Sequence, residues 1–163
     1  MTTKELLLHQ TELACNGDEM SLLCGVYARK WTPPDNLIRD PDNDLSEGEA
    51  ARRPDGWYQG IGEILKHVAE CKVMYMTQAF GPPPQALAEP GESLTSLLAC
   101  LEAAQAHLKT CLAKLDEAAL ARPVPTSSHG ESAAHLFWVL AQHDVAHGSQ
   151  IVMIRDMLRA SGA

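Results

Sequence analysis

The chain has 163 residues, of which 45% are hydrophobic and only 5% aromatic, and its formal net charge is −8 at pH 7. A length of this order fits one domain, so we expect a single domain over residues 1–163 with roughly 70% of the unfolded surface buried. The acidic balance, without a cluster among the 13 Lys and Arg residues, excludes a nucleic-acid-binding surface. Abundant Ala and Leu with few aromatic residues predict an all-α protein.

The first residues, MTTKELLLHQTE, have neither the apolar core of a secretion signal nor the length of a membrane span. The five cysteines form no CxxC pair. An odd number of cysteines without a secretion signal is typical of reduced thiols. We therefore expect a cytoplasmic protein with no membrane partner.

A first helix is predicted over residues 3–16, where Leu6 and Leu13 lie one heptad apart on the same face. An Asn-Gly-Asp triplet follows and can end the helix. The heptad phase nevertheless continues beyond the triplet, so the sequence also allows the helix to run through Gly17 to about residue 29.

A long connection over residues 31–56 follows, rich in Pro, Asp, Asn, Arg and Gly. It has too few apolar residues for a regular element of any length. Within it, Ser46 and Glu49 have the spacing of a capping box, which predicts a short helix in LSEGEAARR across the bundle end. Long ordered connections in compact domains often carry binding residues.

Three further helices are predicted, from about residue 55 to Gly81, over residues 92–120, and over residues 131–160. The last one opens on a second capping-box pattern, Ser128 and Glu131. Four helices joined by one long and two shorter connections predict a four-helix bundle, with the long crossover between the first and second helices.

Polar residues interrupt the seams of predicted core positions, which recur at alternating steps of four and three. In the second helix the seam is Gly60, Ile64, His67, Cys71, Met74 and Gln78. In the last helix it is Leu136, Leu140, His143, His147, Gln150, Ile154 and Met157. In the third helix Gln105 interrupts a row of leucines. Histidines thus stand where a bundle helix usually has leucine.

The pair His143 and His147 lies on one helix face, one turn apart, so both rings can reach a single ion. Buried imidazole needs a hydrogen-bond partner or a metal. One such histidine alone is most often a hydrogen-bonded core residue. A pair with His67 on a facing helix instead matches a three-ligand catalytic site with open positions. The sequence therefore predicts a single divalent metal ion at His67, His143 and His147.

Two seam residues neighbour these histidines. Cys71 lies one turn from His67 and can act as a soft fourth ligand or redox-sensitive thiol. Because free cysteine is common as a small buried residue, we interpret it as a packing residue of the core. Gln150 lies beyond His147 and can hydrogen-bond a metal-binding side chain, or simply make a polar contact at the seam end.

Two other classes of metal site are excluded by the spacing. A di-iron carboxylate bundle requires Glu-x-x-His on two helices. The residues three before His67, His143 and His147 are Ile, Leu and Asp. The zinc motif HExxH requires Glu after its first histidine, whereas Asp144 stands here.

Four segments within about residues 45–160, taken in this order, resemble the DinB/YfiT-like metal-binding four-helix bundles. They are LSEGEAARRP, IGEILKHVAECKVMY, LDEAALARPVP and LAQHDVAHGSQIVMIRDML. The resemblance implies a homodimer that holds Zn, Ni, Fe or another divalent ion with three histidines, which fall here on His67, His143 and His147. One departure is that Ser149 precedes Gln150, where the family commonly has glycine.

Proteins similar to this family include transferases and isomerases that use bacillithiol, mycothiol or glutathione, and some hydrolases. The resemblance therefore implies a metal-dependent enzyme that joins a low-molecular-weight thiol to a small electrophilic substrate, as in detoxification. Two alternatives stay open at the level of the sequence. One is a metal-dependent hydrolase of the same fold, and the other is a non-enzymatic metal-binding stress-response protein.

Overall fold

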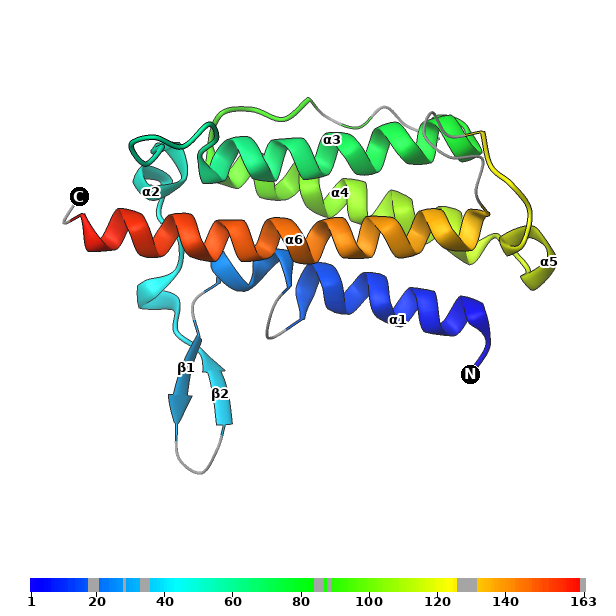
Figure 1. Cartoon of the computed structure of the whole chain (residues 1–163), viewed down its shortest axis with the longest axis horizontal. Coiled ribbons are helices and arrows are strands. Elements are labelled where there is room, and N and C mark those ends of the chain that lie inside the picture. Colours follow the sequence, from blue (N-terminus) through cyan, green and yellow to red (C-terminus); the bar gives the residue numbers. More distant parts are fainter. Residues whose placement is uncertain are drawn as a thin grey trace.

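The structure is a computed structural model that describes residues 1–17, 21–27, 29–32, 36–83, 87, 89–125 and 132–161. Its four main helices are α1 (Thr3–Asn16), α3 (Ile61–Phe80), α4 (Leu94–Ala113) and α6 (Ala133–Ala160). The helix α6 runs along the whole molecule, with α3 on one side and α1 on the other, and α4 packs against α3 and α1 (Figure 1). The predicted all-α four-helix bundle is confirmed.

Short elements fill the crossover between α1 and α3. They are the 3₁₀ helices η1 (Leu22–Gly25) and η2 (Pro41–Asn43), the strands β1 (Arg29–Thr32) and β2 (Asn36–Arg39), and the helix α2 (Glu47–Ala51). The strands pair antiparallel and project from the bundle as a hairpin (Figure 1). The connection was expected to hold no long regular element, and each strand has four residues. The hairpin itself was not predicted, because it satisfies its backbone by local pairing and needs no core of its own. The predicted capping box at Ser46 and Glu49 is confirmed at the start of α2.

The first helix has its predicted bounds. It ends at Asn16, and the N–H of Gly17 donates to the carbonyl of Leu13 at 2.9 Å. Because residues 22–25 form a 3₁₀ helix and residues 29–32 a strand, an α-helix running through Gly17 to about residue 29 is excluded.

The second predicted helix starts later than expected, at Ile61 rather than near Asp55. Gly56 has a φ of 79°, which a helix does not allow. Gly60 then caps α3 with an extended backbone, and its N–H donates to the Glu63 carboxylate at 2.6 Å. A side chain at Gly60 would place Cβ only 2.6 Å from the carbonyl oxygen of Arg52.

The third predicted helix is two helices, because Asp116 accepts from the N–H of Ala119 at 2.7 Å and so starts the short helix α5 (Glu117–Leu120). The last helix begins at Ala133, where the Ser132 side chain caps the N–H of His135. The predicted capping box of Ser128 and Glu131 lies outside the described residues.

The buried faces are rotated from the predicted seams. Leu6 and Leu13 are exposed, and α1 instead buries Leu7, Thr11, Ala14 and Cys15. Met74 and Met157, which belong to the predicted seams, are exposed as well. Since α3 makes its most extensive contacts with α4, its buried stripe turns that way and leaves His67 and Cys71 at the edge that faces α6.

The apolar core consists of two clusters. The first lies toward the crossover, with Ile61, Leu65 and Val68 of α3 among its members. The second lies toward the other end, with Met76 and Phe137. Among the described helices, none is both long and apolar enough to cross a membrane.

Candidate metal centre

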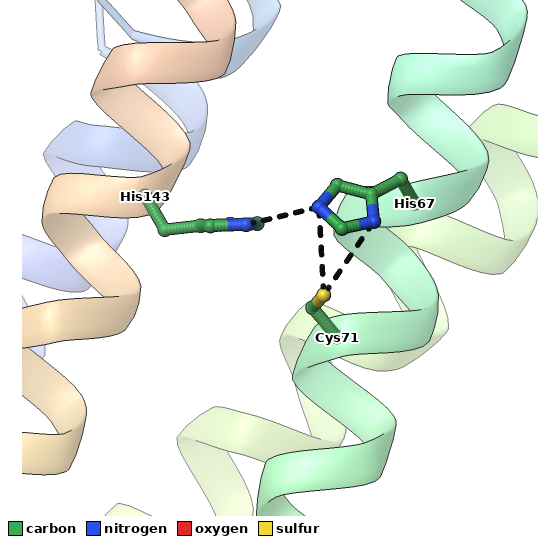
Figure 2. Close-up of side chains that lie close together, drawn as sticks. All are labelled: His67, Cys71 and His143. Atoms are coloured by element: carbon green, nitrogen blue, oxygen red, sulfur yellow. Dashed lines mark hydrogen bonds between the residues drawn. The ribbon is translucent and has the colours of Figure 1, made fainter. Parts of the chain in front are cut away.

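The helices α3 and α6 bring His67, His143 and His147 together. Nε2 of His143 lies 3.3 Å from Nε2 of His67 and 3.2 Å from Nε2 of His147. The ring centroids are 4.4 to 5.2 Å apart. Figure 2 shows His67 and His143 pointing at one another across the space between the two helices. All three rings are half-buried, so the outer side of the cluster is open to solvent.

Cys71 touches this cluster from one turn farther along α3. Its Sγ lies 3.7 Å from Nδ1 and 3.6 Å from Nε2 of His67 (Figure 2). His67, Cys71 and His143 offer ligand atoms that all lie within 4.8 Å of one another. Burial, and then the charge on Glu70, raises the pKa of the Cys71 thiol. The sulfur is therefore protonated at neutral pH unless a cation draws off its proton.

Gln150 contacts the cluster from the other end. Its Oε1 lies 2.7 Å from Nδ1 of His147, in the geometry of an N–H donating to a carbonyl oxygen. A neutral imidazole carries one N–H, so this hydrogen bond leaves the lone pair of His147 on Nε2, directed at His143. Such a contact orients a metal-binding ring and fixes its tautomer.

The electrostatic surroundings keep two of the rings neutral. Burial lowers the pKa of His143 to about 4, helped by His147 and His67 and, to a smaller extent, by the charge on Lys72. Burial also lowers the pKa of His147, against an upward effect of its bond to Gln150. Neutral imidazole is the form that binds metal, so at pH 7 both side chains are ready to act as ligands.

The arrangement of these side chains suits a shared divalent cation better than it suits hydrogen bonds between the rings. Nε2 of His143 faces two imidazole nitrogens, and its buried Nδ1 has no partner among the described residues. His67 and His143 could hold a cation there, with Cys71 or His147 beside them, and such an ion would relieve the crowding of nitrogens that hydrogen bonds satisfy only in part. Imidazole with a thiol at the edge is a donor set that suits Zn²⁺, and imidazole also suits Ni²⁺ and Fe²⁺.

The nearby carboxylates are engaged elsewhere. Glu63 pairs with Arg53 and accepts from the N–H of Gly60. Glu70 lies 3.8 Å from the Lys66 ammonium. Asp144, although it follows His143 in the chain, points into the core. Among the described residues, the cluster is therefore made of imidazole and thiol groups, without a carboxylate.

Glycine lets the crossover approach the centre closely. A Cβ at Gly148, the residue after His147, would overlap the carbonyl oxygen of Ser21. Ser21, directly before η1, thus packs on α6 beside the last histidine, and only glycine leaves room for it.

The sequence analysis did not predict a role for Lys72, which is wholly buried and ion-paired with Asp144 at 2.7 Å. A signal for it existed, because Lys72 continues the helical spacing of Leu65 and Val68 toward Met76, all of which are buried. The predicted seam ran through Cys71 instead.

A family model for the DinB superfamily matches residues 43–151. The match spans α2, α3, α4, α5 and the first part of α6, and it includes the three histidines with Cys71 and Gln150. No curated protein and no solved structure gives a significant match to the chain. Because the matched segment is more than half of the chain, the protein belongs to the DinB superfamily.

Proposed function

We propose that the protein binds one divalent metal ion through His67, His143 and His147. The observation that supports this best is the approach of the three Nε2 atoms, with neighbouring pairs at 3.2 and 3.3 Å, from two different helices. Imidazole nitrogens as the donors, with no carboxylate in the described part of the cluster, favour zinc, nickel or iron over magnesium or calcium.

We further propose a thiol-dependent transferase or isomerase of the detoxification type as the activity. When bound, a divalent ion lowers the pKa of a coordinated thiol, which supplies a nucleophilic thiolate at neutral pH. The chain contributes the neutral ligands, the orientation of His147 by Gln150, and an open outer side through which a small electrophile can approach. A homodimer, as the resemblance implies, completes this proposal.

Metal content tests the site. Elemental analysis of purified wild-type protein should find about one ion per chain. A His143→Ala/His147→Ala variant should lose it, whereas His135→Ala on the same helix should keep it. Equal metal content in the wild type and the double variant would refute the site.

Cofactor dependence tests the activity. Metal-loaded protein is incubated with an aryl halide and with bacillithiol, mycothiol or glutathione in turn. The proposal expects conjugation that requires both the thiol and the ion and disappears in His143→Ala/His147→Ala. Hydrolysis of an ester without any thiol would favour the hydrolase instead. The absence of both conjugation and ester hydrolysis would favour the non-enzymatic metal-binding protein.

A further inference from the structure

A layer of buried polar residues crosses the middle of the bundle, with one residue from each main helix. The four are Thr11 of α1, Lys72 of α3, Gln105 of α4 and Asp144 of α6. Lys72 is 0% exposed and Asp144 is 2% exposed. The layer lies between the two apolar clusters of the core. On each main helix, the buried members of one cluster come before the layer residue in the sequence, and those of the other cluster come after it.

Hydrogen bonds run through the whole layer. The ammonium of Lys72 donates to Oδ2 of Asp144 at 2.7 Å and to Oε1 of Gln105 at 2.7 Å. Nε2 of Gln105 donates to the carbonyl oxygen of Thr11 at 2.9 Å. One connected set of contacts therefore joins all four helices at a single level.

Stability alone does not account for this layer. Two charges lose their hydration on burial, and apolar side chains of similar volume in place of a buried ion pair are often neutral or stabilising. What an ion pair adds is geometry, because a hydrogen bond of this kind weakens within a few tenths of an ångström, whereas apolar side chains can slide past one another.

The ion pair shares its helical turns with the metal centre. Lys72 directly follows Cys71 on α3, and Asp144 directly follows His143 on α6. Successive residues of a helix are rotated by about 100°. The same two turns thus present the histidine cluster on the outer side of the interface between α3 and α6 and the ion pair on its inner side.

We propose that Lys72 and Asp144, held by Gln105, are positioning residues of the metal centre. They set the separation and register of α3 and α6 so that the histidines of both helices meet, and in this way they set the affinity for the ion. The inference rests on the metal site proposed above, and it assigns a role to residues that are not ligands.

The test replaces the whole layer with apolar side chains. In the variant Lys72→Met/Gln105→Leu/Asp144→Val, the apolar-layer variant, one positive and one negative charge are lost together, so the net charge is unchanged. We expect native helical circular dichroism and a urea midpoint close to that of the wild type. The affinity for Co²⁺, measured by calorimetry and by its visible absorption, should fall roughly 10–100-fold, as is typical when contacts behind metal ligands are lost.

A matched control is a buried charge on the same helix that does not reach α3. Arg155 donates to the carbonyl oxygens of Gly25 and Asn43 in the crossover. Arg155→Met should lower the urea midpoint but leave the Co²⁺ affinity within about twofold of the wild type. An equal loss of Co²⁺ affinity in Arg155→Met would show a general effect of instability and would overturn the positioning role.

The outcomes separate this inference from the proposed function. No Co²⁺ binding by the wild type would overturn both. Binding by the wild type and a folded apolar-layer variant with equal affinity would overturn only the positioning role. Should the apolar-layer variant not fold, Gln105→Met, which keeps the ion pair but frees it from α4, should still weaken Co²⁺ binding severalfold. Wild-type affinity in that variant would then overturn the inference.

Discussion

Replacement of Lys72 alone by methionine should destabilise the metal-free protein by about 4 kcal/mol at pH 7. The Asp144 carboxylate has one described partner for Oδ2, the Lys72 ammonium, and none for Oδ1. In Lys72→Met the carboxylate stays in a site that is 2% exposed and loses its counter-charge.

The magnitude follows from two alternatives for the variant, of which the one with the smaller free-energy cost applies. The protein folds either with a protonated Asp144 carboxyl or with an ionised carboxylate that has no counter-charge. A carboxyl in an unfolded chain has a pKa of about 3.9, and each pH unit above it adds about 1.36 kcal/mol to the cost of protonation. Folding with a neutral carboxyl therefore costs about 4 kcal/mol at pH 7 and about 1.5 kcal/mol at pH 5. Direct loss of one partner of a buried pair costs about 3–5 kcal/mol, so the two routes agree at neutral pH.

The pH dependence has a definite sign. In the wild type, burial raises the pKa of Asp144 and Lys72 opposes this increase. In Lys72→Met only burial acts, so the pKa rises further above its unfolded value. Its native state then binds more protons than its unfolded state, so stability falls as pH rises through the range between the two pKa values. The gap to the wild type should widen from about pH 4 to pH 7. In Asp144→Val the titrating carboxyl is gone, so a loss of about 3–5 kcal/mol should not widen over this range.

Urea denaturation in the presence of a chelator measures both effects. With a slope of about 2 kcal/mol per molar, a loss of about 4 kcal/mol moves the midpoint by about 2 M. The apolar-layer variant serves as the control, since it removes both charges at once. A loss below about 1 kcal/mol in Lys72→Met at pH 7, or the same loss at pH 5 and pH 7, would show that the pair is not the buried charge couple described above.

Three further outcomes are expected. Metal affinity should fall as pH drops, because protons compete for imidazole, and the steepest loss should lie near pH 4, since the pKa of His143 is lowered to about 4; flat affinity from about pH 8 to about pH 4 in metal titrations would contradict the three-histidine site. Chelation should lower the melting temperature without loss of the helical circular dichroism signal, because the two apolar clusters fold without the ion, and a random-coil spectrum would refute this. Gly148→Ala should cost about 1–3 kcal/mol in urea unfolding, because its Cβ meets the backbone of Ser21, and wild-type stability would show that the crossover moves freely.

The helices and the three histidines could be predicted because their signals are local. His143 and His147 are four residues apart, and their common face follows from helix geometry without knowledge of any neighbour. The start of α3 was harder to predict. Helical periodicity can continue through Asp55, whereas the positive φ of Gly56 is a property of the folded backbone.

The ion pair could not be predicted in the same way. Lys72 and Asp144 are 72 positions apart, and each looks like an ordinary charged residue on a solvated face. Their burial depends on the direction in which α3 and α6 turn toward the other helices. A heptad seam drawn through Cys71 and His143 misses that direction by one residue on both helices, about 100° of rotation. Short sequence spacings therefore predict the histidine cluster, and long-range packing determines which residues lie behind it.

The spacing along α6 explains why its inner face is a suitable place to control the metal centre. His143 and His147 form an outer row, and Asp144 and Gly148 form an inner row one residue later, so each inner residue shares a turn with a histidine. Arg155 lies eight residues beyond His147, about 12 Å along the axis, where it bonds the crossover instead. We therefore expect a change at Asp144 to affect both rings within one turn, and a change at Arg155 to affect the far end of the helix. If the positioning role proposed above holds, the inner row adjusts the approach of the two rings without itself contacting the ion.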